Sequence, residues 1–350
     1  MNTLKKSFIL TVIKRIDLKK TYLPSLTFLF AVHHILKNKS LSKHAIISAI
    51  AVTLSYLLSS LDHNHFLPPL RYIQLLSMIV FSDYAYKFIN QKELNSAMKS
   101  LTILSIIFVL HGYIFPIDEY SVRNFLIFHR VAGIAGEPNY SAAILFSISV
   151  YFIFSKERWW SILSITLGLF SFSRAYIISI IFLVIILLIK RINHNSARHL
   201  SKLLILFIVT YPITLEMMHQ YLPVNVFSKI YNLNPRIKHQ LFFINHVKEN
   251  PLGLGIKQST DHYRKNYNLI YKKGMNNNSI DEQHNLTVEI LADLGVFGYA
   301  YFVFLIIYFV LRAEDTIYTS LLLTPYIFIN GLNEILLYIL IPILTTKKRK

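Results

Sequence analysis

The stretch that decides the fold is 279–311, which reads SIDEQHNLTVEILADLGVFGYAYFVFLIIYFVL. It begins polar and then runs apolar, with Glu289 and Asp293 as the only charges after residue 285. Ser279 followed by Glu282 has the spacing of a capping box, which predicts a helix that begins here and continues to the end of the stretch. An apolar helix of this length is typical of a membrane span with a polar start at the water interface.

Two residues at this polar start could carry chemistry. His284 and Asn285 would lie in the first turn of the predicted helix, where the backbone N–H groups carry partial positive charge. A histidine in this place can meet a water-borne substrate while the rest of its helix is held in lipid. The alternative is an interfacial histidine without a catalytic task.

The composition of the whole chain agrees with a membrane protein. Of 350 residues, 54% are hydrophobic, and the mean hydropathy is +0.45. We therefore expect an all-α fold, a polytopic transmembrane bundle of about 11–12 spans at roughly 20 residues each. The net charge of +18 would suggest nucleic acid in a soluble protein, but the basic residues fall between the apolar runs, as they do in membrane proteins. Cysteine is absent, which excludes disulfides and thiolate chemistry.

Apolar segments divide the chain into three parts: an N-terminal bundle over 1–218, a long polar loop over 219–283, and C-terminal helices over 284–350. Residues 1–20 read as an amphipathic interfacial helix or a short first span. The later segments are 21–36, 44–61, 70–89, 97–115, 139–155, 159–173, 174–190, 201–218, 286–311 and 316–344. The last of these reads as two short spans broken near Asn330 and Gly331.

Every second loop between these segments is basic, which predicts that it faces the cytoplasm. The alternate loops then face the other side of the membrane, outward: 62–69, 116–138, the turn at Ser173 and Arg174, and the long loop. Within the long loop, apolar residues recur at helical spacing over 235–249. We expect an amphipathic helix there, with its apolar side toward lipid or the bundle, followed by a flap over 257–283.

The predicted outer face collects cations that the topology does not require. Arg123, Arg130, Arg174 and Arg236 all fall in outer loops or at span ends. Anion binding is a natural reason, because the guanidinium group matches phosphate with two parallel hydrogen bonds. The alternatives are that Arg174 lies along the interface, that Arg123 and Arg236 are solvated, and that Arg130 pairs with Glu137.

The turn over 133–140 holds two glycines, then Glu137, Pro138 and Asn139, just before an apolar segment. It predicts a shaped loop with a carboxylate at a helix N-terminus, where negative charge is favoured, or else a plain N-terminal turn. No histidine pair has companion carboxylates at metal-binding spacing, and no nucleotide-binding motif is present. We expect no metal and no cofactor, so that the energy for any reaction comes with the substrate.

Four blocks in order now resemble the O-antigen ligase and polymerase family (Wzy and WaaL). They are residues 130–139, the Ser-Arg turn at 172–175, an Arg-led helix ending in Asn-Pro-Leu-Gly-Leu-Gly at 235–255, and His-Asn followed by Gly and Tyr at 284–299. The aromatic residue often found after the arginine of the third block is here His239 or Phe242. The remainder, 1–115, is similar only as apolar spans.

The resemblance implies a metal-independent glycosyltransferase with a GT-C-like bundle, acting on undecaprenyl-diphosphate-linked glycans at the periplasmic face. It implies that Arg174 and Arg236 bind the diphosphate and that His284 is a general base or positions the acceptor hydroxyl. Arg123, Arg130, Glu137, Asn139 and Asn285 would bind or shape the path of the substrates.

The resemblance favours a polymerase, which joins lipid-linked repeat units into O-antigen or a related surface polysaccharide. The alternative in the same family is a ligase that moves the glycan onto lipid A-core. A flippase for the same lipid-linked sugar is a third reading, although transporters usually show midplane charges and inverted repeats. Expected partners are membrane lipids and possible chain-length regulators, and nucleic acid is not expected.

Overall fold

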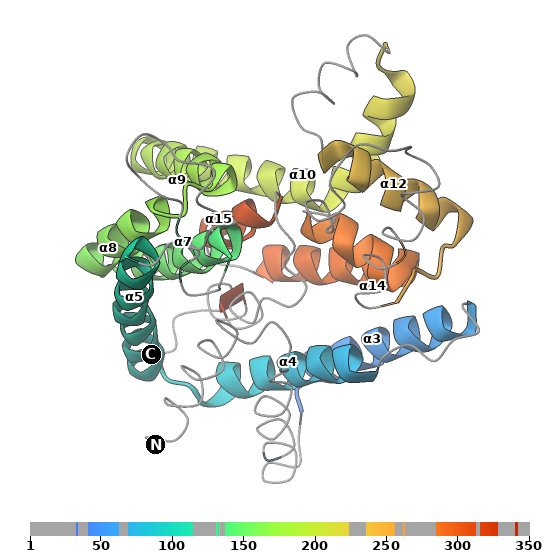
Figure 1. Ribbon diagram of the computed structural model, residues 1–350, viewed down its shortest axis with the longest axis horizontal. Helices are drawn as coiled ribbons and strands as arrows, with labels where there is room; N and C mark the ends of the chain where they lie inside the picture. Colours follow the sequence, from blue (N-terminus) through green and yellow to red (C-terminus); the bar gives the residue numbers. More distant parts are fainter. Residues whose placement is uncertain are drawn as a thin grey trace.

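The computed structural model describes residues 33, 41–62, 69–114, 131, 133, 137–223, 236–255, 262, 285–312, 316–327 and 340–341. These ranges contain ten α-helices, one 3-10 helix and no strand (Figure 1). The prediction of an all-α fold is thereby confirmed. The predicted helix or span at 1–20 and the flap at 257–283 lie outside the described residues, apart from His262.

The helices follow the apolar segments of the sequence closely. Their bounds are α3 Lys43–Asp62, α4 Pro69–Phe88, α5 Gln91–Ile114, α7 Pro138–Phe154, α8 Arg158–Leu169, α9 Arg174–Ile192, α10 His194–Tyr221, α12 Arg236–Glu249, α14 Leu286–Arg312, α15 Thr316–Leu323 and the 3-10 helix η2 Thr324–Ile327. The predicted amphipathic helix over 235–249 is present as α12.

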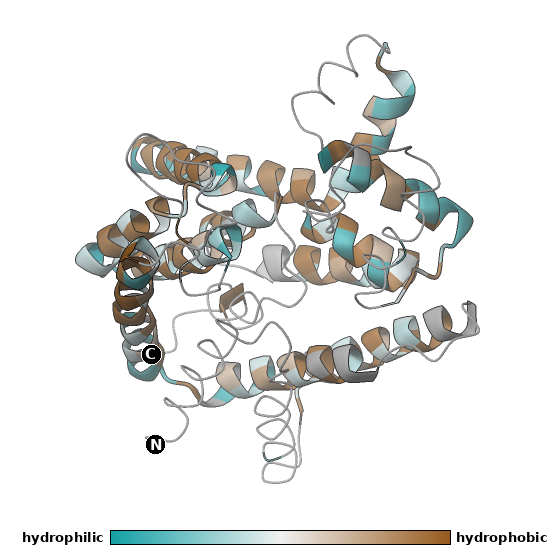
Figure 2. Ribbon diagram, viewed as in Figure 1, coloured by the Kyte–Doolittle hydropathy of each residue, from teal (hydrophilic) through white to brown (hydrophobic). Residues whose placement is uncertain are grey.

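Four helices in the described part are long and apolar enough to cross a membrane: Gln91–Ile114, Arg174–Ile192, His194–Tyr221 and Leu286–Tyr308. Shorter apolar helices accompany them in α3, α4 and α7. In Figure 2 the hydrophobic colour follows α5, α9 and α10, whereas α12 carries more of the hydrophilic colour. The protein is therefore a multi-pass membrane protein, while the total of about 11–12 spans stays a prediction.

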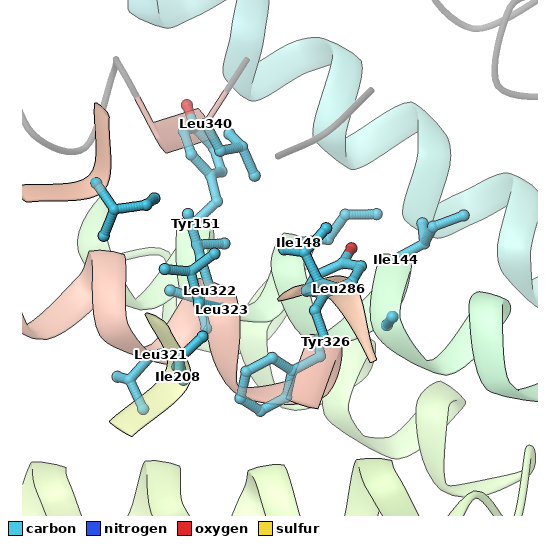
Figure 3. Packing of buried hydrophobic residues seen from close by; sticks show 14 of the residues in the cluster. Ile144, Ile148, Tyr151, Ile208, Leu286, Leu321, Leu322, Leu323, Tyr326 and Leu340 are labelled. Atoms are coloured by element: carbon cyan, nitrogen blue, oxygen red, sulfur yellow. The ribbon is translucent and has the colours of Figure 1, made fainter. Parts of the chain in front are cut away.

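The core lies where α7, α10, α14 and α15 meet. Ile148 of α7, Leu286 of α14 and Tyr326 of η2 pack beside one another in this cluster (Figure 3). Seven of the eight residues of α15 are buried, and the helix lies between α7, α9 and α10 (Figure 1). At about 1.5 Å per residue, α15 is too short to cross a bilayer, so it is a core helix.

The segment 316–344 therefore needs a correction. The predicted first short span is the buried helix α15, and the chain leaves α-helical geometry at Thr324, before the expected break at Asn330 and Gly331. Pro325 explains the early end, because proline removes a backbone donor and disfavours helical geometry in the residue before it. Residues 328–339 lie outside the described ranges.

One polar contact joins α5 to the turn between α7 and α8. The Glu157 carboxylate accepts hydrogen bonds from Asn95 Nδ2 at 2.8 Å and from Lys99 Nζ at 3.0 Å. These hydrogen bonds, first that of Asn95 and then that of Lys99, lower the pKa of Glu157 below its ordinary value. Because the pKa is lowered on folding, the contact stabilises the fold at neutral pH and is lost as the pH falls through that pKa.

The predicted helix over 279–311 also needs correction. α14 begins at Leu286, and it is interrupted at Gly295, where φ is 68° and ψ is −170°. Figure 1 shows α14 as two helical segments that meet at an angle. This backbone conformation is open almost only to glycine.

A loop from the end of α12 fills the interruption. Leu254 N donates to the Ala292 carbonyl at 2.8 Å, Gly255 N donates to the Asp293 carbonyl at 2.9 Å, and Val296 N donates to the Pro251 carbonyl at 2.9 Å. In an unbroken helix the carbonyl of residue 292 would accept from residue 296. The loop 251–255 thus replaces helical hydrogen bonds, and we call this contact the interlock.

Two glycines make the interlock possible. A Cβ atom on Gly253 would lie 2.3 Å from the backbone nitrogen of Gly295, and one on Gly295 would lie 2.5 Å from the carbonyl oxygen of Pro251. Both glycines have positive φ, 82° and 68°. Backbone therefore lies directly against backbone, which leaves no room for a side chain.

We predict that Gly253→Ala and Gly295→Ala each destabilise the protein. Strained backbone of this kind costs on the order of 1–3 kcal/mol per residue before the clash with backbone is added. The thermal midpoint of the protein in detergent, followed by fluorescence, should fall by several degrees. Val296→Ala is the matched control, because it removes an exposed side chain and keeps the amide hydrogen bond of the interlock. Equal midpoints for all three variants would refute the interlock.

Candidate active site

The turn between α8 and α9 presents Arg174. The Ser171 hydroxyl donates to the Gly168 carbonyl at 2.7 Å, and Ser173 N donates to the Ser171 hydroxyl at 3.2 Å. Phe172 between them has a φ of 46°, in the left-handed region. The turn is therefore tightly bonded, and Arg174, the first residue of α9, is exposed directly after it.

The start of α9 is also anchored on its buried side. The Tyr176 hydroxyl donates to the Ile165 carbonyl of α8 at 2.8 Å. A Cβ atom on Gly168 would lie 2.2 Å from the Tyr176 ring, so glycine makes the space that the tyrosine occupies. These contacts hold the first turn of α9 against α8 while Arg174 faces outward.

A chain of hydrogen bonds connects this turn to the start of α7. Ser173 Oγ donates to Asn139 Oδ1 at 3.0 Å, and Asn139 Nδ2 donates to Glu137 Oε1 at 2.9 Å. Ser173 therefore uses its side chain on Asn139 and does not cap α9. The structure brings three predicted site residues together here: Glu137, Asn139 and, directly after Ser173, Arg174.

The segment that carries the other predicted arginines is joined to the same turn. Val131 N donates to the Phe170 carbonyl at 3.1 Å, and the Val131 side chain is buried against α5 and α8. Arg130, which precedes it, and Arg123 lie outside the described residues.

α12 and the first half of α14 place Arg236. The two helices pack through a cluster that includes Ile237, Leu241, Val288 and Ala292, so the apolar side of α12 faces the bundle. The interlock joins their C-terminal ends. Helices that lie side by side with joined C-terminal ends have their N-terminal ends on the same side. The half-buried Arg236, which begins α12, therefore lies on the same side as the start of α14.

Asn285 forms the start of α14. Its Oδ1 accepts hydrogen bonds from Thr287 N at 2.9 Å, Val288 N at 3.0 Å and Thr287 Oγ1 at 2.6 Å. These are the bonds of an N-cap residue, so the helix begins after Asn285 and not at the predicted capping box of Ser279. His284 and the box itself lie outside the described residues.

The same side chain reaches a second element. Asn285 Nδ2 donates to the Ile327 carbonyl of η2 at 2.8 Å. η2 packs against α7, α9 and α14, so it lies between the helices that carry the predicted site residues. Sequence reasoning missed this element. The available signal was Thr324 followed by Pro325 within an apolar run.

The sequence model of the O-antigen ligase family Wzy_C matches residues 159–303, from the start of α8 into the second half of α14. This range carries the Ser173 and Arg174 turn, α12 with its loop, and the Asn285 helix start. The chain contains a Wzy_C O-antigen ligase domain. The family covers O-antigen ligases and polymerases, which are glycosyltransferases that act on lipid-linked glycans. No curated protein and no solved structure matches the chain significantly.

Within the Wzy_C domain, the structure gives a role to Gly295 and Tyr299, the residues that follow His284 and Asn285 in the fourth block. Gly295 leaves the space in which the loop 251–255 packs. The Tyr299 hydroxyl donates to the Val209 carbonyl of α10, three residues before Pro212. Both contacts place the two halves of α14 against other helices of the domain.

Both α14 and α12 carry buried polar residues. Glu289 and Asp293 are 2% and 1% exposed, so both carboxylates face the protein interior rather than lipid. On α12, His239 and Gln240 are buried, and the Tyr211 hydroxyl of α10 donates to Gln240 Oε1 at 2.7 Å. Within the described ranges, no three His, Asp or Glu side chains are grouped closely enough to hold a metal ion.

The charges at the helix starts suit an anionic ligand. Arg174 and Arg236 each begin a helix that has no acidic residue in its first turn. The N-terminal end of a helix carries partial positive charge, so each arginine adds like charge there. A phosphate or diphosphate would meet backbone N–H groups and a guanidinium group at once.

We predict that Asn139→Ala weakens both the fold and the site. It removes the middle of the chain from Glu137 to Ser173, and the loss of a buried partner costs about 1–3 kcal/mol. The thermal midpoint should fall by several degrees, and glycan transfer should fall because the turn before Arg174 loses its support. Ser147→Ala is the control, since this buried hydroxyl on α7 makes no hydrogen bond with the described residues. If both variants kept the wild-type midpoint, the hydrogen bonds that run from Glu137 through Asn139 to Ser173 would have no structural role.

Proposed function

We propose that the protein is a polymerase that joins undecaprenyl-diphosphate-linked repeat units into O-antigen or a related surface polysaccharide. The observation that carries the proposal is the place of Arg174 within a Wzy_C domain. Arg174 is exposed at the start of α9, and the side chain of Ser173 before it does not cap this helix. A guanidinium group at the positive end of a helix favours a diphosphate, and the donor of this family carries its glycan on a lipid.

The proposed reaction is a glycosyl transfer from one lipid-linked glycan to another. A hydroxyl oxygen of the acceptor sugar forms a bond to the anomeric carbon of the donor, and the bond from that carbon to the diphosphate oxygen breaks. His284 takes the hydroxyl proton as general base. Undecaprenyl diphosphate leaves with the electron pair, and Arg174 and Arg236 stabilise the charge that develops on it.

The remaining predicted residues would shape the substrate path. Glu137 and Asn139 lie directly beside the turn before Arg174 and would contact either glycan there. Arg123 and Arg130 stay predictions for the same path. The active face would be periplasmic in a bacterial inner membrane, with membrane lipids around it and a chain-length regulator as an expected partner.

Two other functions would use some of the same residues. A ligase would use the same donor and transfer it to lipid A-core, and the shared family blocks suit both enzymes. The Glu137, Pro138 and Asn139 form of the first block is the feature that favours the polymerase. A flippase would also need cations for the diphosphate, but it would not need the acceptor base that we assign to His284.

We predict that His284→Ala and Arg174→Ala abolish polymer formation in cells, and that Arg236→Ala lowers it strongly. Each variant removes either the proton acceptor or positive charge at the diphosphate, and removal of one such stabilising group costs about 100- to 1,000-fold in rate. Polymer is measured on lipopolysaccharide gels from cells that express each variant in place of the wild type, with membrane levels checked by immunoblot.

Arg191→Ala is the matched control, because Arg191 lies exposed near the opposite end of α9. It should support normal polymer. Normal polymer from both His284→Ala and Arg174→Ala would show that the assigned residues do not form the active site.

Deletion of the gene should leave core lipopolysaccharide that carries a single repeat unit, and re-expression should restore the ladder of long chains. This pattern is expected because ligation continues when only polymerisation is lost. Bare core with long glycan still bound to undecaprenyl diphosphate would identify a ligase instead. Bare core without periplasmic polymer would identify a flippase.

A further inference from the structure

The side chain of Asn285 does more than its position as an N-cap requires. Capping a helix needs only an acceptor, and Ser, Thr and Asp serve as well as Asn. The Oδ1 atom of Asn285 meets that need with three accepted hydrogen bonds. The Nδ2 group is left for another contact, and it donates to the Ile327 carbonyl. Donors on one side and a carbonyl on the other define the orientation of the amide.

The 3-10 helix η2, which Asn285 contacts, lies against other helices that carry predicted site residues. All four residues of η2 are buried, and η2 packs against α7, α9 and α14. α7 begins after Glu137, and α9 begins with Arg174. The hydrogen bond from Asn285 to Ile327 therefore ties the start of α14 to a buried element that packs against both other helices.

Exposure argues against a direct contact of this side chain with substrate. Asn285 is 2% exposed, and both ends of its amide are engaged in hydrogen bonds. A substrate group would have to displace either the helix cap or the Ile327 carbonyl. The contacts suit a residue that holds its neighbour in place.

We propose that Asn285 is a positioning residue, which sets the place of His284 relative to Arg174 through its bond to the Ile327 carbonyl. The inference rests on the proposed function, because it takes His284 as the base and Arg174 as a diphosphate ligand. The Cα atoms of residues 284 and 285 are about 3.8 Å apart in any trans peptide. A shift of about 1 Å at a catalytic group can cost 100-fold in rate, so a small movement of this helix start matters.

Asn285→Asp separates the two tasks of the side chain. A carboxylate still accepts from Thr287 N and Val288 N, and negative charge is favoured at a helix N-terminus. In its ionised form, which the helix N-terminus favours, it cannot donate to the Ile327 carbonyl, and its second oxygen faces that carbonyl instead. The helix start is kept while its tie to η2 is broken.

The test uses the purified full-length protein, reconstituted with lipid-linked repeat units extracted from a strain that lacks the gene. Initial rates give kcat and KM for wild type, Asn285→Asp, Thr287→Val and His284→Ala, and the thermal midpoint of each is measured. Thr287→Val is the matched control, because it removes another hydrogen bond to Asn285 and leaves the Ile327 contact in place.

For Asn285→Asp we expect kcat to fall roughly 10- to 100-fold with KM within about threefold, while the midpoint falls by several degrees because the buried Ile327 carbonyl loses its donor. Thr287→Val should keep kcat within about twofold of wild type, since the tie to Ile327 persists. A kcat in Asn285→Asp that returns to the wild-type value at temperatures well below the midpoint of the variant would overturn the proposal, because it would mean a merely structural role.

Normal kcat in Asn285→Asp together with an inactive His284→Ala would overturn the positioning role and leave the proposed function standing. An active His284→Ala would remove the assigned base, and both would then fail.

Discussion

The interlock between loop 251–255 and Gly295 is the contact on which the arrangement of the domain depends. A helix interrupted within a membrane protein leaves backbone groups that water cannot satisfy, and each such group costs several kcal/mol in a nonpolar surrounding. Here Leu254, Gly255 and Pro251 supply the missing partners. The same contact makes the ends of α12 and α14 one unit, so the position of Arg236 follows from the backbone geometry at Gly295.

A second connection to other elements lies at the N-terminal end of α14. Asn285 closes the first turn of the helix and also reaches η2, a buried 3-10 turn that touches α7 and α9. The Wzy_C match ends at residue 303, so η2 comes from the part of the chain beyond it. Between the interlock and Asn285, the first half of α14 is fixed at both ends, which would hold the proposed base His284 in place.

Arg174 and Arg236 lie in the same electrostatic setting, each at the N-terminal end of a different helix. Each arginine begins a helix, where the backbone already carries partial positive charge. The Ser173 hydroxyl donates a hydrogen bond to Asn139 and does not cap α9. Both features would favour an anion at the proposed site. Preorganised positive charge of this kind stabilises a departing diphosphate without rearrangement during the reaction.

The sequence by itself determined the helices, because apolar runs and the 3.6-residue repeat depend on local composition. It located α12 over 235–249, the turn before Arg174 and the membrane class of the protein, and its four motif blocks pointed to the family. Only the tertiary structure decided the break at Gly295, the N-cap at Asn285 and the role of η2. Leu294 and Val296, the residues directly before and after Gly295, are both apolar, so hydropathy gives no sign of a break at this glycine. The partners that stabilise these sites lie some 40 residues away in the chain, and only folding brings them into contact.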